Sequence, residues 1–246
     1  GELTATGSAS LTVENYSGEQ INAGKAFSMA DSVTLGGSTE LDNGMTVSMS
    51  FELEGGGDAV NSFDDHSVSI SSDSLGTFKF SGNGGSSAVS AIDATAAGNV
   101  YDSFDGQVGT AETAIAAGDA AMLTSPGGNN TMLYTLPELV DGLSVSASYT
   151  PQGATIGASS SSAYGLTYTG VEGLSVSYGA GSNDAANGTT LDADVTTMKA
   201  SYAYGSVTVA YSDHEFDSAT STRDQDTTSY SIAYTVSDAI SVTYGT

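Results

Sequence analysis

The sequence predicts an all-β fold: a transmembrane, antiparallel, up-and-down β-barrel. Apolar and polar residues alternate with a period of two along many short segments, and the connections between these segments are alternately short and long. No apolar run approaches the roughly 20 residues that a transmembrane helix needs. A period of two gives a strand one apolar and one polar face, and a closed barrel satisfies all backbone groups of its strands in lipid. We therefore expect a single barrel domain over residues 1–246.

The clearest strand covers 45–53, where the alternation has no error. Its apolar positions are Met45, Val47, Met49, Phe51 and Leu53. The turn Asp42-Asn43-Gly44 precedes this strand, and Asn-Gly supplies the positive φ that a tight hairpin needs. The strand before the turn covers 29–41, so the two segments form a hairpin.

The rest of the chain repeats this hairpin, with one interruption. The other strands are expected at 3–13 and around 68–70, 78–80, 132–136, 143–149, 164–168, 174–178, 198–202, 207–211, 230–234 and 240–244. This gives about thirteen strands. Long polar loops are expected over 14–28, 54–65, 151–161, 180–194 and 213–227. Residues 82–129 break the rhythm: they are Gly/Ala-rich, and Ala favours a short helix over 90–97. A segment of this length without strands either argues against the assignment or indicates a functional role.

Two regularities favour a barrel in an outer membrane. All short turns would lie at one end of the sheet and all long loops at the other, as in barrels with short periplasmic turns and long external loops. Tyrosines also recur on the apolar parity, mostly near strand ends, and we expect them to form an aromatic girdle at the membrane interfaces. These tyrosines are Tyr134, Tyr149, Tyr164, Tyr168, Tyr178, Tyr202, Tyr211, Tyr230, Tyr234 and Tyr244.

The composition excludes several classes of function. The net charge is −25 and the basic residues are Lys25, Lys79, Lys199 and Arg223, so no basic patch exists to bind nucleic acid. Without cysteine there is no disulfide or thiolate zinc site. His66 and His214 stand alone, and no serine elbow has a histidine partner, so we expect neither zinc nor enzymatic catalysis. No signal peptide is visible, and the start at Gly1 is typical of a mature, cleaved N-terminus.

Periodicity alone leaves two arrangements open. In a protein with a dry core the apolar parity points inward, whereas in a transmembrane barrel it points outward to lipid. The modest size of the apolar residues, the scarcity of charge on the polar parity and the short/long asymmetry of the connections favour the barrel. The alternative is a secreted or cell-surface acidic β-protein, an adhesin or surface-layer module that binds calcium.

Several motifs resemble the repeated hairpins of Gram-negative porins. They are Tyr164-Gly165-Leu166-Thr167-Tyr168-Thr169, Gly173-Leu174-Ser175-Val176-Ser177-Tyr178, Leu75-Gly76-Thr77-Phe78-Lys79-Phe80, and Tyr134-Thr135-Leu136-Pro137 followed by Gly142-Leu143-Ser144-Val145-Ser146-Ala147-Ser148-Tyr149. Each motif is loose, and the order and spacing over the whole chain are the specific part of the resemblance.

The resemblance implies a sixteen-stranded barrel in the bacterial outer membrane, a homotrimer in contact with the lipid bilayer and lipopolysaccharide. It implies passive diffusion of small hydrophilic solutes and ions. Segment 82–129 corresponds in position to the third external loop of porins, which folds into the lumen and constricts it. Because thirteen strands is an odd number, about three C-terminal strands are expected to be missing from this sequence, unless strands have been split or merged.

The charged residues of the polar parity are the candidates for selectivity. We expect Lys79 and Lys199 in the lumen, with Glu40 and Glu52 on its wall. The resemblance implies that carboxylates of the constriction loop face the lysines across the narrowest point; the candidates are Asp93, Asp102, Asp105, Glu112 and Asp119. Alternatively, both lysines are wall residues that pair with wall acids such as Glu52. The excess of acidic residues predicts a preference for cations.

Paired carboxylates in the external loops are weak candidates for a structural calcium ion, which prefers oxygen ligands. They are Asp64, Asp65, Asp192, Asp194, Asp224 and Asp226. None matches the EF-hand pattern, and a solvated acidic rim explains the same residues without any metal.

Overall fold

The computed structural model describes residues 2–16, 24–55, 65–89, 96, 129–151, 160–184, 192–218, 224–237 and 240–246. Thirteen strands form a single antiparallel sheet in the order β1 to β13. They are β1 (Glu2–Tyr16), β2 (Gly24–Glu40), β3 (Thr46–Gly55), β4 (His66–Ser72), β5 (Gly76–Asn83), β6 (Thr131–Thr135), β7 (Leu143–Thr150), β8 (Ser160–Tyr168), β9 (Leu174–Asp184), β10 (Ala193–Tyr204), β11 (Val207–Ser218), β12 (Gln225–Ser237) and β13 (Ile240–Gly245).

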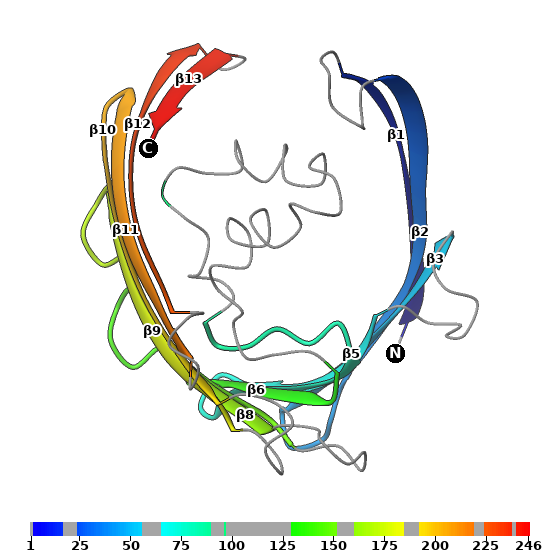
Figure 1. Ribbon diagram of the computed structural model, residues 1–246. Helices are drawn as coiled ribbons and strands as arrows, with labels where there is room; N and C mark the ends of the chain where they lie inside the picture. The colour runs from blue at the N-terminus through cyan, green and yellow to red at the C-terminus, as the bar shows by residue number, and fades with distance from the viewer. Residues whose placement is uncertain are drawn as a thin grey trace.

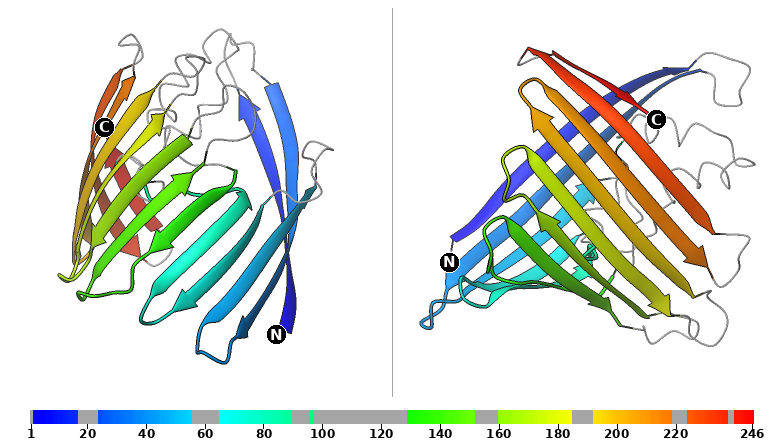
Figure 2. Two further views of the ribbon diagram at one scale, coloured as in Figure 1. Left: turned by 90° about the horizontal axis from the view of Figure 1, so that it is seen from below. Right: turned by 90° about the vertical axis from the view of Figure 1, so that its left-hand side faces the viewer.

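The sheet is strongly curved and every strand pairs with its neighbours in sequence. Figure 1 shows the strands arranged as an incomplete ring, with the opening between β1 and β13. The two further views show all strands tilted in the same sense around the ring, as barrel geometry requires (Figure 2). The prediction of an up-and-down antiparallel sheet with thirteen strands is confirmed.

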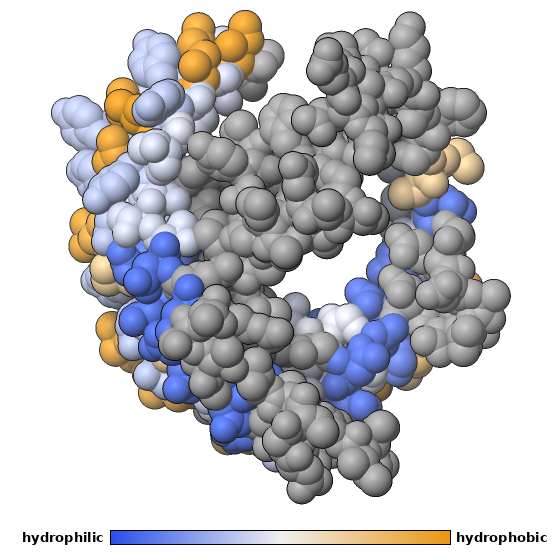
Figure 3. Space-filling view, viewed as in Figure 1, coloured by the Kyte–Doolittle hydropathy of each residue, from blue (hydrophilic) through white to orange (hydrophobic). Residues whose placement is uncertain are grey.

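The outer face of the sheet carries the apolar parity. Met49, Tyr164 and Val209 are each about half exposed, at 45%, 52% and 45%. Among the described residues only Ala88, Val89, Ala96, Ala163 and Val195 are both apolar and buried. The apolar parity therefore does not pack within a dry interior. Figure 3 shows hydrophobic residues along the outer rim and hydrophilic residues beside the hollow on the concave side.

Several strands run further than the alternation predicts. The expected loop 14–28 shrinks because β1 continues to Tyr16 and β2 begins at Gly24. The expected loop 213–227 shrinks because β11 continues to Ser218 and β12 begins at Gln225. Ladder hydrogen bonds join backbone groups, so β11 continues through Asp213, His214 and Glu215, where both of its faces are polar.

The short turns hold adjacent hairpins together. The backbone N–H of Ala203 donates to the carbonyl oxygen of Gly173 over 2.8 Å, and the N–H of Thr169 donates in the same way to Gly142 over 2.8 Å. Gly173 has a φ of 77°, and a Cβ there would collide with the Ala203 carbonyl. The turn thus needs glycine both for its conformation and for the close approach of the next hairpin. No helix in the described ranges is long and apolar enough to span a bilayer.

Candidate functional site

The concave face of the sheet is lined mainly by hydroxyl side chains. One row of directly opposed residues crosses this face from β2 to β11. Its members are Ser38, Ser48, Ser69, Lys79, Leu133, Ser148, Ala163, Gly181, Val195 and Phe216. The neighbouring rows hold Ser50 with Ser67 and Ser177 with Thr167. A surface of this kind offers both donors and acceptors to water and polar solutes.

Both predicted lysines lie on the concave face. Lys79 on β5 is exposed, between Ser69 and Leu133. Lys199 on β10 is half-buried, between Ser177 and Ser212. The two lysines therefore occupy different surroundings, with Lys79 on the open side of the concave face.

The predicted wall acids share this face. Glu40 is exposed at the end of β2, and Glu52 is half-buried on β3 opposite Thr34. In register, Lys79 faces Ser69 and Ser69 faces Ser48, and Glu52 lies four positions further along β3 than Ser48. The Cα atoms of Lys79 and Glu52 are therefore about 10 Å apart across the strands, which is two strand spacings, and about 13 Å apart along them, which is four residues. The register therefore argues against the alternative in which Lys79 pairs with Glu52.

The described part of segment 82–129 lies against the concave face (Figure 1). The backbone N–H of Ala88 donates a 2.9 Å hydrogen bond to Ser148 Oγ on β7. Val89 is fully buried and forms a small apolar cluster with Ala88, Ala163 and Leu133. The chain leaving β5 thus turns inward and crosses over β6 towards β7 and β8.

The inserted segment makes a second contact with the concave face, at β10 and β11. The backbone N–H of Ala96 donates a 2.8 Å hydrogen bond to Ser212 Oγ. Beside it, Thr197 and His214 are buried, and the Thr197 hydroxyl is hydrogen-bonded to His214 Nδ1. His214 Nε2 is buried without a hydrogen-bond partner. Thr197 and His214 lie on one face of a single-layer sheet, so their burial requires that another part of the protein covers that face.

Several predicted site residues lie outside the described part of the chain. These are Asp93, Asp102, Asp105, Glu112 and Asp119, together with the expected helix over 90–97 and the calcium candidate Asp64. The placement of Asp194 and Asp226 in loops is wrong: Asp194 lies on β10 and Asp226 on β12. Within the described ranges no three His, Cys, Asp or Glu residues are grouped so that they could hold a metal ion.

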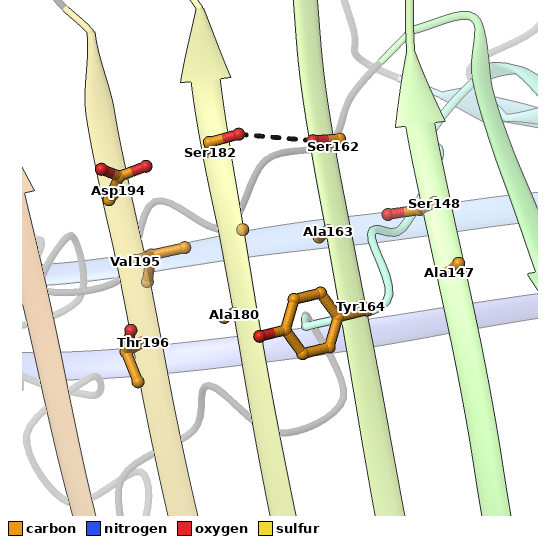
Figure 4. Close-up of a pocket in the computed structure, with 11 residues that line it drawn as sticks. Ala147, Ser148, Ser162, Ala163, Tyr164, Ala180, Ser182, Asp194, Val195 and Thr196 are labelled. Atoms are coloured by element: carbon orange, nitrogen blue, oxygen red, sulfur yellow. Dashed lines mark hydrogen bonds between the residues drawn. The ribbon is translucent and has the colours of Figure 1, made fainter.

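The predicted girdle tyrosines project from the outer face. Tyr211 and Tyr230 contact each other with ring centroids 5.2 Å apart, and Tyr134 donates a 2.6 Å hydrogen bond to the carbonyl oxygen of Leu75. An open depression of about 610 Å³ lies over β7 to β10 (Figure 4). Its outward members include Tyr164, Ser182 and Asp194. Seven of its eleven lining residues are on the outer parity, and the other four, Ser148, Ala163, Gly181 and Val195, belong to the concave row.

Alternation alone did not identify the residues that contact the inserted segment. Ser148 and Ser212 look like any other serine of the polar parity. Leu133, Ala163 and Val195 do leave a signal, because each places an apolar residue on the polar parity. In the structure all three are at least half-buried, and two of them contact the inserted segment.

The chain matches a family model described as Gram-negative porin over residues 1–246. The chain belongs to the Gram-negative porin family. It is a protein of the bacterial outer membrane, and its family consists of channels. No curated protein sequence matches this porin. The alternative of a secreted surface module is not supported, because the family is one of channels and the apolar parity is exposed.

Solved porin structures share the fold of this porin. An anion-selective porin from Comamonas acidovorans has a TM-score of 0.58 at 18% identity, covering 99% of this chain and 78% of that one. Salmonella typhi OmpF, in a complex with daunomycin, has a TM-score of 0.59 at 16% identity, covering 94% and 73%. A mutant of the Rh. blastica porin has a TM-score of 0.52 at 14% identity, covering 99% and 93%. At these identities the likeness concerns the fold alone.

Proposed function

We propose that this porin lets small hydrophilic solutes and ions diffuse passively along its concave face, and that segment 82–129 constricts the passage. The observation that carries the proposal is the contact of Ala88 and Ala96 with Ser148 and Ser212 on the hydroxyl-lined wall. A segment held there narrows the lumen from the side of β6 to β11. Lys79, on the adjacent strand β5, is exposed beside this part of the wall.

The proposal includes a preference for cations that arises mainly outside the constriction. Among the concave residues whose side chains the structure describes, the charged ones are Lys79, Lys199, Glu40 and Glu52, two of each sign. Carboxylates gather instead at the ends of β9 to β12 that adjoin the long connections, including Asp194, Glu215 and Asp217. Such a rim concentrates cations at one mouth of the channel. We therefore expect a modest cation preference that weakens with salt.

The proposal also includes a homotrimer in contact with lipopolysaccharide. It rests on the resemblance of the hairpin motifs to those of porins. The exposed apolar outer face supports contact with lipid or with another copy of the chain, since each would cover such a surface.

Conductance across a planar lipid bilayer tests the proposal. The purified protein should produce stepwise currents, and a tenfold gradient of KCl should give a reversal potential of cation sign that shrinks as both salt concentrations rise together. Choline chloride, with its larger cation, serves as the size control. A protein that inserts into the bilayer, shows heat-modifiable migration on gels and passes no current would contradict the proposal.

A further inference from the structure

Two serine hydroxyls on the strands of the concave face accept hydrogen bonds from backbone N–H groups of the inserted segment. Ser148 Oγ accepts from the N–H of Ala88, and Ser212 Oγ accepts from the N–H of Ala96, at 2.9 and 2.8 Å. All four residues are buried, and Ser212 is fully so. These serines lie on β7 and β11, so the two contacts are far apart around the wall.

Only side chains can make such bonds in the middle of a sheet. The backbone N–H and C=O groups of β7 and β11 are used by the ladders with their neighbours. A segment that lies flat on the face therefore meets side chains, and its own buried N–H groups need an acceptor. Serine is short enough to accept such a bond while the segment stays in contact with the wall.

The register places each of these serines close to a lysine. Ser212 lies directly opposite Lys199. Lys79, Leu133 and Ser148 are consecutive members of one cross-strand row, so Ser148 is two strand spacings, or about 10 Å, from Lys79. Leu133, between them, packs against the Ala88 and Val89 pair. The contact of Ala88 and Val89 with the wall therefore lies beside Lys79.

We propose that Ser148 and Ser212 are positioning residues that fix the inserted segment to the wall and thereby set the size of the passage beside Lys79. This inference rests on the proposed function, in which the segment is the constriction. Neither serine needs to touch the solute. Each serine acts through the hydrogen bond that its hydroxyl accepts from a backbone N–H of the segment.

Engineered disulfides test the placement without reference to channel activity. The chain has no cysteine, so Ala88→Cys with Ser148→Cys and Ala96→Cys with Ser212→Cys each introduce a single pair. Both pairs should oxidise readily in the folded protein, because a side-chain hydrogen bond to the adjacent backbone brings the Cβ atoms near disulfide range. The control pair Ala88→Cys with Ser177→Cys places the second thiol on β9 and should stay reduced. Equal oxidation of the control, or failure of both test pairs, would overturn the inference.

Single-channel recording tests the positioning role. The double variant Ser148→Ala with Ser212→Ala should show larger conductance and roughly tenfold more frequent current fluctuations, because two buried N–H groups lose their acceptors. Ser148→Thr with Ser212→Thr keeps both hydroxyls and should restore steady currents. Ser177→Ala is the matched control, since its hydroxyl is hydrogen-bonded to Thr167 on the neighbouring strand.

The two experiments separate the inference from the proposed function. If the disulfides form and the wild-type protein passes no current, the placement stands and the channel function fails. If the protein conducts normally and the double alanine variant has unchanged conductance and noise, the channel function stands and the positioning role of the serines is wrong.

Discussion

Asp194 on β10 lies directly opposite Asp217 on β11, with both carboxylates exposed on the outer parity. A second acidic pair, Glu215 and Asp226, is opposed in the same way between β11 and β12. Like charges that face each other across a ladder repel, since their Cβ atoms are about 5 Å apart. The acidic rim is therefore a strained part of the sheet at low salt.

Neutralising one member of the Asp194 pair should stabilise the protein. Asp217→Asn is expected to raise the free energy of unfolding by about 0.2–1 kcal/mol at low salt. The gain should vanish near 1 M NaCl, where the Debye length is about 3 Å. Asp73→Asn, in the turn between β4 and β5, is the control. Urea unfolding in detergent or lipid measures the free energy of unfolding of both variants. If Asp217→Asn lowered this free energy, the two carboxylates would not repel each other in the folded protein.

The same pair tests the calcium hypothesis. Calcium bound by the rim carboxylates would raise the unfolding temperature of the wild type more than magnesium or sodium at equal ionic strength. Asp217→Asn would lose that difference. If the three cations raised the unfolding temperature equally at equal ionic strength, the cations would act only by screening the rim carboxylates, and a specific calcium site would be rejected.

Lys79 should influence ion selectivity. Lys79→Gln removes a positive charge from the open side of the concave face, so the preference for cations should increase. The measurement is the reversal potential in a KCl gradient, compared with Asp73→Asn, which changes a charge at a short turn away from the wall. An unchanged reversal potential for Lys79→Gln would place the selectivity elsewhere.

Met49 and Ser50 offer a matched test of the two faces, because they are adjacent on β3 and point to opposite sides. Met49→Arg should destabilise the protein by about 2–4 kcal/mol in a bilayer, as a cation on the lipid face does near the midplane. Ser50→Arg should change the stability by about 0.5 kcal/mol or less and lower the conductance instead. Equal losses of stability would contradict the assignment of the faces.

Glycine at the short turns should matter most where the next hairpin approaches. Gly44 and Gly173 both have positive φ, at 80° and 77°, but a Cβ at Gly44 meets nothing within 4 Å. Gly44→Ala should therefore cost about 1–2 kcal/mol from its left-handed backbone alone. Gly173→Ala should cost roughly 1–3 kcal/mol more, because the Ala203 carbonyl must move. If the two variants lost the same free energy of unfolding in refolding experiments, the close approach of Gly173 to the Ala203 carbonyl would contribute nothing to stability.

The strands were predictable because their two faces differ. A slip of one residue would exchange every side chain between lipid and lumen, so the period of two is maintained wherever the strand crosses the membrane, as in 45–53. The ends of β11 and β12 were not predictable from this signal, since Asp213, Glu215 and His214 make both faces polar there. The presence of Lys79 and Lys199 on the polar parity followed from the alternation alone.

The contacts of the inserted segment were beyond the reach of periodicity. Ser148 and Ala88 are 60 positions apart, and nothing in either residue's surroundings specifies the other. The partial clue is the apolar character of Leu133, Ala163 and Val195 on a parity that is mostly polar. Such residues indicate that part of the wall is covered, and only the fold shows by which segment.

The accessibility of single cysteines along β11 tests most directly whether lipid covers the apolar parity. Nitroxide labels would be attached at 207, 208, 209, 210 and 211 in turn, with the protein in lipid bilayers, and their collisions with oxygen and with a water-soluble nickel chelate compared. Labels at Val207, Val209 and Tyr211 should collide mainly with oxygen, which concentrates in the hydrocarbon, and labels at Thr208 and Ala210 mainly with the chelate. If Val209 is shielded from both reagents, the apolar parity lies in a dry protein core and lipid does not cover it.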